Sequence, residues 1–249
     1  MTVSDLDAQV VRDAAAGAAG KRGYVQRIFS EIAPRYDLLN RLLSLGIDRA
    51  WRTAALRALR WERVPAGRYL DLCAGTLDVG AALVRRPGFA GAVVGADFAE
   101  PMLRAGRSKA TGVRLAPVVA DAVQLPLPDA AVDGAIVAFG IRNVAQLDRA
   151  LVEVHRVLRP GARFVILEFS TPRFPLVRAL YLFYFHHILP IIGGLISGHA
   201  TAYRYLPESV KHFPERDVLA ARLRAAGFTD VSWRALTFGI AALHIGERA

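Results

Sequence analysis

Residues 68–78 read RYLDLCAGTLD: an apolar run, a turn of small residues and the first residues of a helix-like segment. In an open α/β sheet, ligands bind beyond the carboxyl ends of the strands, where small residues let the backbone approach the ligand closely. The run 68–73 therefore predicts a buried strand, and Ala74-Gly75-Thr76 predict a ligand-binding loop.

The same alternation continues along the chain. Further apolar runs stand at 92–96, 113–119, 132–139 and 162–169. Helix-like segments stand between them at 77–86, 100–109 and 147–158. Strands that alternate with helices predict right-handed crossovers and a parallel sheet with helices on both faces.

The C-terminal part changes this pattern. A helix is expected at 215–226, followed by strand-like runs at 228–237 and 239–245. Only Phe238-Gly239 separates these runs, which is too short for a parallel crossover, so one strand must be antiparallel to its neighbour.

Two helical segments are expected to be added to this sheet. Glycines interrupt the alanine-rich residues 1–22, which we expect to be a flexible lead-in. Residues 23–249 are expected to form one domain, with a helical cap at 24–62 and an inserted lid at 172–213. The aromatic segment from Phe174 to Ile196 contains charged residues, a proline and glycines, so no membrane-spanning helix is expected there.

The composition favours a globular protein of a reducing compartment. Of 249 residues, 53% are hydrophobic and 22% are charged, so the chain can bury a large core. A single cysteine, Cys73, excludes an intramolecular disulfide and any multi-cysteine metal site. The first residues lack the basic start and apolar run of a secretory signal, so we expect a cytoplasmic protein.

The net charge of +10 suggests an anionic partner. The arginines are scattered and are not grouped with aromatic or glycine residues, which disfavours nucleic acid as the partner. An anionic membrane surface is an equally good partner for this charge.

The six histidines show no metal-ligand spacing, so no metal site is expected.

The loop after residue 72 narrows the choice of cofactor. It lacks the G-x-G-x-x-G pattern, and although Gly75 and Gly80 have P-loop spacing, Ala81-Ala82 replace the Lys-Ser/Thr pair that binds phosphate and magnesium. Asp71 would repel a pyrophosphate but suits a cationic sulfonium ligand with an amino group. The loop therefore favours S-adenosylmethionine.

Two further acids follow later strands. Asp97 ends the second apolar run, where a carboxylate can accept hydrogen bonds from both hydroxyls of a ribose. Asp121 ends the third run, where adenine contacts are expected. Each aspartate alone is more often a helix cap or turn residue, but three at successive strand ends favour a cofactor site.

Four motifs occur in order along the chain. They are Tyr36-Asp37-Leu38-Leu39-Asn40 with Ser44 and Trp51, Phe139-Gly140-Ile141-Arg142-Asn143, Arg156-Val157-Leu158-Arg159-Pro160-Gly161 with Leu167-Glu168-Phe169-Ser170, and Tyr203-Arg204-Tyr205-Leu206-Pro207-Glu208-Ser209. In these motifs, from about Tyr24 to Glu247, the chain closely resembles the quinone-biosynthesis C-methyltransferases. Leu77 stands where that family usually has glycine.

The resemblance implies a Rossmann-like class I methyltransferase fold and S-adenosylmethionine-dependent C-methylation of a prenylated quinol in menaquinone or ubiquinone biosynthesis, with demethylmenaquinol as the expected substrate. The expected cofactor residues are Asp71, Gly75, Thr76, Asp97, Asp121, Ala122 and Ala138. Two alternatives stay open: a methyltransferase of a small secondary metabolite, and a non-catalytic scaffold in which Leu77 crowds the methionine end of the cofactor.

Arg142 is the expected catalytic residue. The ring carbon becomes nucleophilic as an adjacent hydroxyl loses its proton, and no His or Glu stands at an obvious strand end facing the substrate. An arginine stays protonated, so we expect Arg142 to stabilise the oxyanion and orient a water. Alternatively, Arg142 merely pairs with a structural acid such as Asp148. Asn143, Tyr36 and Tyr203 are expected to align the quinol, and Asp37 and His199 are the next candidates for a base.

A nearly insoluble quinol implies a membrane surface as a partner. Residues 174–196 are expected to form an amphipathic aromatic lid, and the scattered arginines would attract anionic headgroups. We therefore expect peripheral association with the inner face of the cell membrane. A homodimer is also conceivable.

Overall fold

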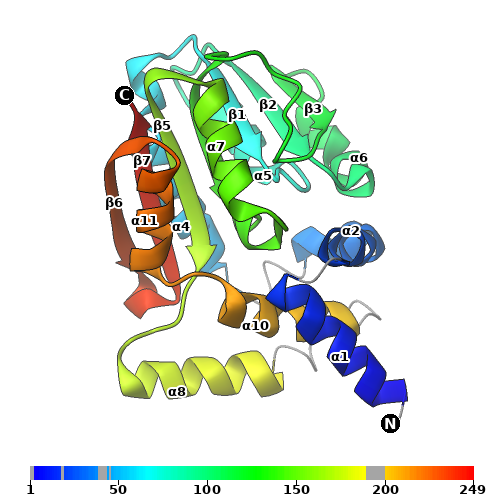
Figure 1. Cartoon of the computed structure of the whole chain (residues 1–249). Helices are drawn as coiled ribbons and strands as arrows, with labels where there is room; N and C mark the ends of the chain where they lie inside the picture. The colour runs from blue at the N-terminus through cyan, green and yellow to red at the C-terminus, as the bar shows by residue number, and fades with distance from the viewer. Residues whose placement is uncertain (1–2, 18–19, 39–43, 45, 189–199) are drawn as a thin grey trace.

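A mixed sheet stands at the centre of the structure (Figure 1). The computed structural model describes residues 3–17, 20–38, 44, 46–188 and 200–249, and within them seven strands pair in the order β3-β2-β1-β4-β5-β7-β6. Their bounds are β1 Arg68–Leu72, β2 Ala92–Asp97, β3 Leu115–Val119, β4 Val132–Ala138, β5 Leu158–Phe169, β6 Phe228–Leu236 and β7 Ala241–Arg248.

The strand directions confirm the predicted arrangement. β1 to β5 are parallel, and β7 is antiparallel to both of its neighbours, β5 and β6. β5 begins at Leu158 and not at 162 as expected, because Leu158 already pairs with Val132 before the register shifts. The preceding helix accordingly ends at Val157.

Helices cover both faces of the sheet, as predicted. One face packs against α7 (Leu147–Val157) and α11 (Arg216–Ala225), and the other packs against α4 (Ile47–Ala58), α5 (Asp78–Val84) and α6 (Glu100–Ala110). Leu151 and Val154 of α7 recur on one side of the helix and are fully buried, and each such burial contributes about 1.5–3 kcal/mol. Short connecting helices are η1 Ala33–Arg35, η2 Trp61–Arg63, η3 Ile141–Asn143 and η5 Thr237–Gly239.

A separate group of helices lies below the carboxyl ends of the strands in Figure 1. It consists of α1 (Val3–Ala16), α2 (Lys21–Ile32), α8 (Pro175–Phe183), the π-helical turn η4 (Tyr184–Ile188) and α10 (Ala200–His212). One apolar cluster joins cap and lid, with Val11 and Val25 contributed by the N-terminal helices and Tyr181 and Tyr205 by the later ones. Cap and lid thus share one core beside the predicted ligand-binding edge.

The N-terminal residues correct one expectation. Residues 1–22 were expected to be a flexible lead-in, but α1 spans Val3–Ala16 and buries Val11, Ala14 and Ala15 against the cap-and-lid cluster. Alanine favours helix, and the expected helix-breaking Gly17 stands after the helix and not inside it. Among the described residues, no helix is both long and apolar enough to cross a membrane.

Candidate active site

The loop after β1 forms a tight turn at the carboxyl edge of the sheet. Cys73 and Gly75 have left-handed backbones, with φ of 52° and 53°. A Cβ on Gly75 would lie 3.3 Å from Cε of Met102 on α6, so glycine suits both the backbone angle and the close approach. The Gly75 amide donates to the Asp97 carboxylate at the end of β2 over 2.8 Å. The predicted loop and the second strand end therefore meet.

Two small cavities lie beside this loop, with volumes of about 110 and 40 Å³. Several predicted residues line them. Asp121 and Ala122 line the larger cavity, and Gly75, Ala138 and Tyr36 line the smaller one. Asp97 and Asn143 line both. Burial raises the pKa of Asp97, whereas the amides of Ala99 and Gly75 favour its charged form. The ends of β1, β2, β3 and β4 supply most of these residues, and they meet at one edge because these strands are parallel neighbours in the sheet.

Asn143 lines both cavities and has an unsatisfied side-chain oxygen. Its side chain is buried, and its Oδ1 atom has no hydrogen-bond partner among the described residues. Such a group costs about 1–3 kcal/mol when left unpaired, so the site suits a ligand that donates a hydrogen bond. Cys73 also lines both cavities and was not among the predicted site residues, although its position directly after β1 could have indicated this. Burial raises the pKa of its thiol well above the usual value.

Asp71 and Thr76 line neither cavity. Asp71 is 1% exposed and accepts the Gly80 amide of α5 over 2.8 Å, and burial raises its pKa to about 7. Thr76 is buried and donates to Asp37 over 2.5 Å. Their cofactor contacts stay predictions.

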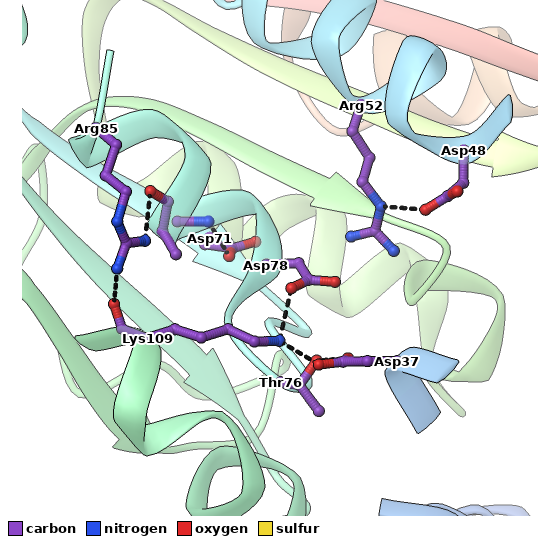
Figure 2. Close-up of polar contacts among 10 residues, drawn as sticks. Asp37, Asp48, Arg52, Asp71, Thr76, Asp78, Arg85 and Lys109 are labelled. Atoms are coloured by element: carbon purple, nitrogen blue, oxygen red, sulfur yellow. Dashed lines mark hydrogen bonds and ion pairs between the residues drawn. The ribbon is translucent and has the colours of Figure 1, made fainter. Parts of the chain in front are cut away.

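Figure 2 shows that Asp37 belongs to a polar cluster at this edge. Lys109 of α6 contacts the carboxylates of Asp37 at 2.5 Å and Asp78 at 2.6 Å, while Thr76 donates to Asp37. Asp37 directly follows Tyr36, so the cluster ties the cap to the loop after β1. The candidate base Asp37 is therefore engaged by Lys109 and Thr76, which the sequence did not indicate.

Leu77 lies at the start of α5 with its side chain in the core. Its backbone is left-handed (φ 66°), a conformation that favours glycine, and its side chain is fully buried in the sheet core. Its Cδ2 atom lies 2.5 Å from the position that a Cβ on Gly95 would take, and Leu77 lines neither small cavity. The side chain is thus part of the core beside the loop, and its effect on the cofactor stays a prediction.

A third cavity, of about 500 Å³, lies between cap, lid and sheet edge. Its wall is mainly apolar and aromatic, and includes Phe29, Trp51, Phe139, Phe169, Tyr181, Tyr184, Phe185 and Tyr205. Phe29, Tyr36 and Phe139 also line the 40 Å³ cavity, so the two spaces adjoin. Two aromatic residues of the lid, Tyr181 and Phe185, are buried and also line this cavity.

Arg142 lies at the inner wall of this cavity, 8% exposed. Its Nη1 atom donates to Glu168 Oε1 over 2.7 Å and to the Phe139 carbonyl over 2.6 Å, and its Nε atom donates to Ser209 of α10 over 3.2 Å. Arg142 does pair with a buried acid, as the alternative expected, but that acid is Glu168 and not Asp148, which pairs with Arg222. The fixed guanidinium fits an anion-stabilising role, which stays a prediction.

Glu168 was missed by the sequence analysis, which expected no acid at a strand end facing the substrate. It is next to last in β5, 1% exposed, and also accepts the Phe169 amide. Burial raises its pKa, and the positive charge of Arg142 opposes this shift. A buried charged pair of this kind orients the arginine firmly.

Other polar groups of the large cavity were also missed. Asp48 pairs with Arg52 at 3.3 Å and accepts from Ser44 over 2.7 Å, as Figure 2 shows in part. The hydroxyl groups of Tyr181 and Tyr205 are buried with no partner among the described residues. Burial raises the pKa of Tyr205 to about 12.

Two predicted residues fall where side chains are not described. The backbone of Tyr203 belongs to α10, but its side chain lies outside the described part, and His199 lies outside it altogether. Among the described residues, no cluster of His, Cys, Asp or Glu could hold a metal ion.

Solved structures define the class of protein. An S-adenosylmethionine-dependent methyltransferase from Thermotoga maritima superposes with a TM-score of 0.61 at 19% identity, covering 90% of this chain and 100% of that one. Phosphoethanolamine N-methyltransferase 2 of Haemonchus contortus, in complex with S-adenosylmethionine, gives 0.55 at 13% identity, covering 78% and 52%. The chain thus has the class I methyltransferase fold, as predicted.

Sequence comparison then places the chain within a family. Residues 17–248 match the profile of the ubiE/COQ5 methyltransferase family. The demethylmenaquinone methyltransferase of Thermus thermophilus is 52% identical over 224 residues (89% of this chain, all of that protein), and that of Deinococcus radiodurans is 48% identical over 226 (90% and 92%). A ubiquinone/menaquinone biosynthesis C-methyltransferase of Geobacter sulfurreducens is 46% identical over 228 (90% and 88%). The chain belongs to the ubiE/COQ5 methyltransferase family.

Proposed function

We propose that this chain transfers a methyl group from S-adenosylmethionine to a ring carbon of a prenylated quinol, with demethylmenaquinol as the substrate. The observation that carries this proposal is the apolar, aromatic cavity of about 500 Å³ that adjoins the small cavities of the loop after β1 and has Arg142 in its wall. The names of the three relatives all include menaquinone or demethylmenaquinone, which favours a naphthoquinol.

The residues around the small cavities fit the cofactor. The unsatisfied Asn143 Oδ1 can accept a hydrogen bond, Asp97 lies between the two spaces, and Gly75 admits a close backbone approach. When bound there, S-adenosylmethionine supplies an electrophilic methyl group. Both cavities are smaller than the ~300 Å³ of a typical ligand pocket, so side chains of the cap must move on binding. Arg22 of α2, which lines the larger cavity and pairs with Asp121 at 3.0 Å, is another side chain that would have to move.

Arg142 and Glu168 supply the chemistry of the chain itself. Glu168 and the Phe139 carbonyl fix the guanidinium, so its charge faces the cavity without reorganisation when a quinol hydroxyl ionises. The apolar wall excludes water and strengthens this interaction. Tyr36, which lines both spaces, and Asn143 are placed to align the ring with the cofactor cavity.

Complementation of defective strains tests the substrate. The chain should restore menaquinone in a strain that accumulates demethylmenaquinone, because its cavity accepts a bicyclic ring with an apolar tail. A parallel strain blocked in ubiquinone methylation distinguishes the benzoquinol, and the empty vector serves as the inactive control. Restoration of ubiquinone alone would contradict the assignment, and rescue of neither strain would contradict the proposed function.

We also propose that the lid contacts a membrane surface. Leu176, Leu180 and Phe183 are 57–65% exposed and lie on one side of α8, and Phe174 precedes them. Leu180 also lines the large cavity, as does Phe238, which is 79% exposed. An exposed apolar row at the mouth of an apolar cavity suits a substrate that resides in a bilayer.

Flotation with liposomes tests this contact. Wild-type protein should float with vesicles containing phosphatidylglycerol, and Leu176→Ser/Leu180→Ser/Phe183→Ser should lose at least about tenfold in binding, because each buried side chain contributes roughly 1.5–3 kcal/mol. Val119→Ser/Val152→Ser/Val218→Ser, which alters exposed apolar residues elsewhere, is the matched control. Failure of the wild type to float at low salt would refute membrane contact.

A further inference from the structure

A second large cavity, of about 510 Å³, lies on the other side of the lid helix from the apolar one. Its wall is formed by the segment after β5, by α8, by the end of α10 and by the start of α11, which lie close together in Figure 1. Four cationic residues line it, Arg173, Arg178, Lys211 and Arg216, against a single carboxylate, Glu215. Neither the fold nor the proposed methyl transfer accounts for this concentration of positive charge.

Arg216 is the innermost of these cations and is 7% exposed. Its Nη2 atom donates to the Thr171 carbonyl over 3.1 Å, and its guanidinium lies 5.1 Å from the centre of the Trp233 ring. Among the described residues, no carboxylate forms an ion pair with it. Burial and the neighbouring charge of Arg173 lower its pKa, so an added anion would relieve an unfavourable environment.

The other cations leave charge available as well. Arg173 pairs with Asp217 at 3.0 Å, but both side chains are largely exposed, so this pair contributes little. Arg178 and Lys211 are exposed and have no ion pair with a described carboxylate. The buried hydroxyl of Tyr181, which also lines this cavity, has no described partner and can donate a further hydrogen bond.

We propose that this cavity binds a phosphate ester, and that the ester is the headgroup of an anionic phospholipid. Arginines present several N–H donors in a fixed geometry that matches phosphate oxygens. α8 carries the exposed apolar residues Leu176, Leu180 and Phe183 on one side and Arg178 on the opposite side, which faces this cavity. If α8 lies in the membrane interface on its apolar side, Arg178 stands at the level of the lipid headgroups, at the rim of the cavity. The assignment of the phosphate to a lipid headgroup rests on the membrane contact proposed above, whereas the anion site itself does not. Neither the site nor the lipid assignment depends on methyl transfer.

Binding measurements without cofactor or quinol test the site. Wild-type protein is titrated with inorganic phosphate, with short-chain phosphatidylglycerol and with short-chain phosphatidylcholine, followed by thermal unfolding and calorimetry. The variants are Arg216→Gln and, in case that buried change impairs folding, the exposed pair Arg178→Gln/Lys211→Gln. Arg104→Gln/Arg107→Gln on α6 removes the same charge elsewhere on the surface.

We expect phosphatidylglycerol to bind the wild-type protein and phosphatidylcholine to bind at least tenfold more weakly. The Arg178→Gln/Lys211→Gln variant should lose at least tenfold in affinity for phosphatidylglycerol, while the control variant should lose less than twofold. If inorganic phosphate binds and the site variants weaken its binding, but phosphatidylglycerol does not bind, the anion is not a lipid headgroup and that part of the proposal is overturned. Equal affinities of wild type and a folded site variant for both ligands would overturn the site. Because methyl transfer is not measured, its failure would leave these outcomes unaffected.

Discussion

Arg142→Lys is expected to lower turnover at least about a hundredfold while leaving S-adenosylmethionine affinity intact, an effect typical of a lost oxyanion donor. Lysine keeps the positive charge but loses the planar fork that reaches Glu168, Phe139 and Ser209 together. The charge would then no longer be held at the cavity wall, so the developing oxyanion would lose its fixed partner.

Steady-state kinetics and calorimetry measure the two parts of this expectation separately. Arg222→Lys is a matched control, because Arg222 forms an exposed pair with Asp148 and lines neither the apolar cavity nor the cofactor cavities. Near-normal turnover in Arg142→Lys would remove Arg142 from the chemistry and reopen the search for a base.

Asp97→Ala is expected to weaken S-adenosylmethionine binding roughly tenfold to a hundredfold, equivalent to about 1.5–3 kcal/mol. The substitution would leave ribose hydroxyls without a partner in a partly buried site. It would also remove the acceptor of the Gly75 and Ala99 amides, so the loop after β1 would lose its tie to β2.

Calorimetry with the folded variant measures this effect, and thermal unfolding shows whether the loop change spreads to the whole domain. Asp97→Asn retains one acceptor oxygen and should fall between the wild type and the alanine variant. The exposed Asp129→Ala is the control for a lost acid at the surface. An alanine variant that binds as tightly as the wild type would exclude Asp97 from the cofactor site.

The order of strands and helices could be predicted from sequence because each element carries a local pattern of apolar residues. Leu151 and Val154, for example, recur at helical spacing and are both fully buried. The helix α1 could not be predicted in the same way, because its stability depends on packing against α10 and α2, which are contributed by distant parts of the chain.

Part of the candidate site could also be predicted from the sequence. Asp97 and Asp121 were found because parallel strands bring their carboxyl ends to one edge, a property that needs only the strand boundaries. The direction of a side chain is not fixed by position alone, and Asp71 points toward the Gly80 amide of α5 instead of the small cavities. Glu168 escaped notice because it stands within an apolar run, and its meaning depends on Arg142, which only the fold brings to it.

Transfer of a labelled methyl group tests the central claim most directly. Purified protein is incubated with S-adenosylmethionine carrying a labelled methyl group and with reduced demethylmenaquinone in vesicles, and the product is located by mass spectrometry. Our account predicts one labelled methyl group on a ring carbon of the naphthoquinone, with the signal reduced at least about a hundredfold in Arg142→Lys. Tight binding of S-adenosylmethionine without any label on the quinone ring would contradict it.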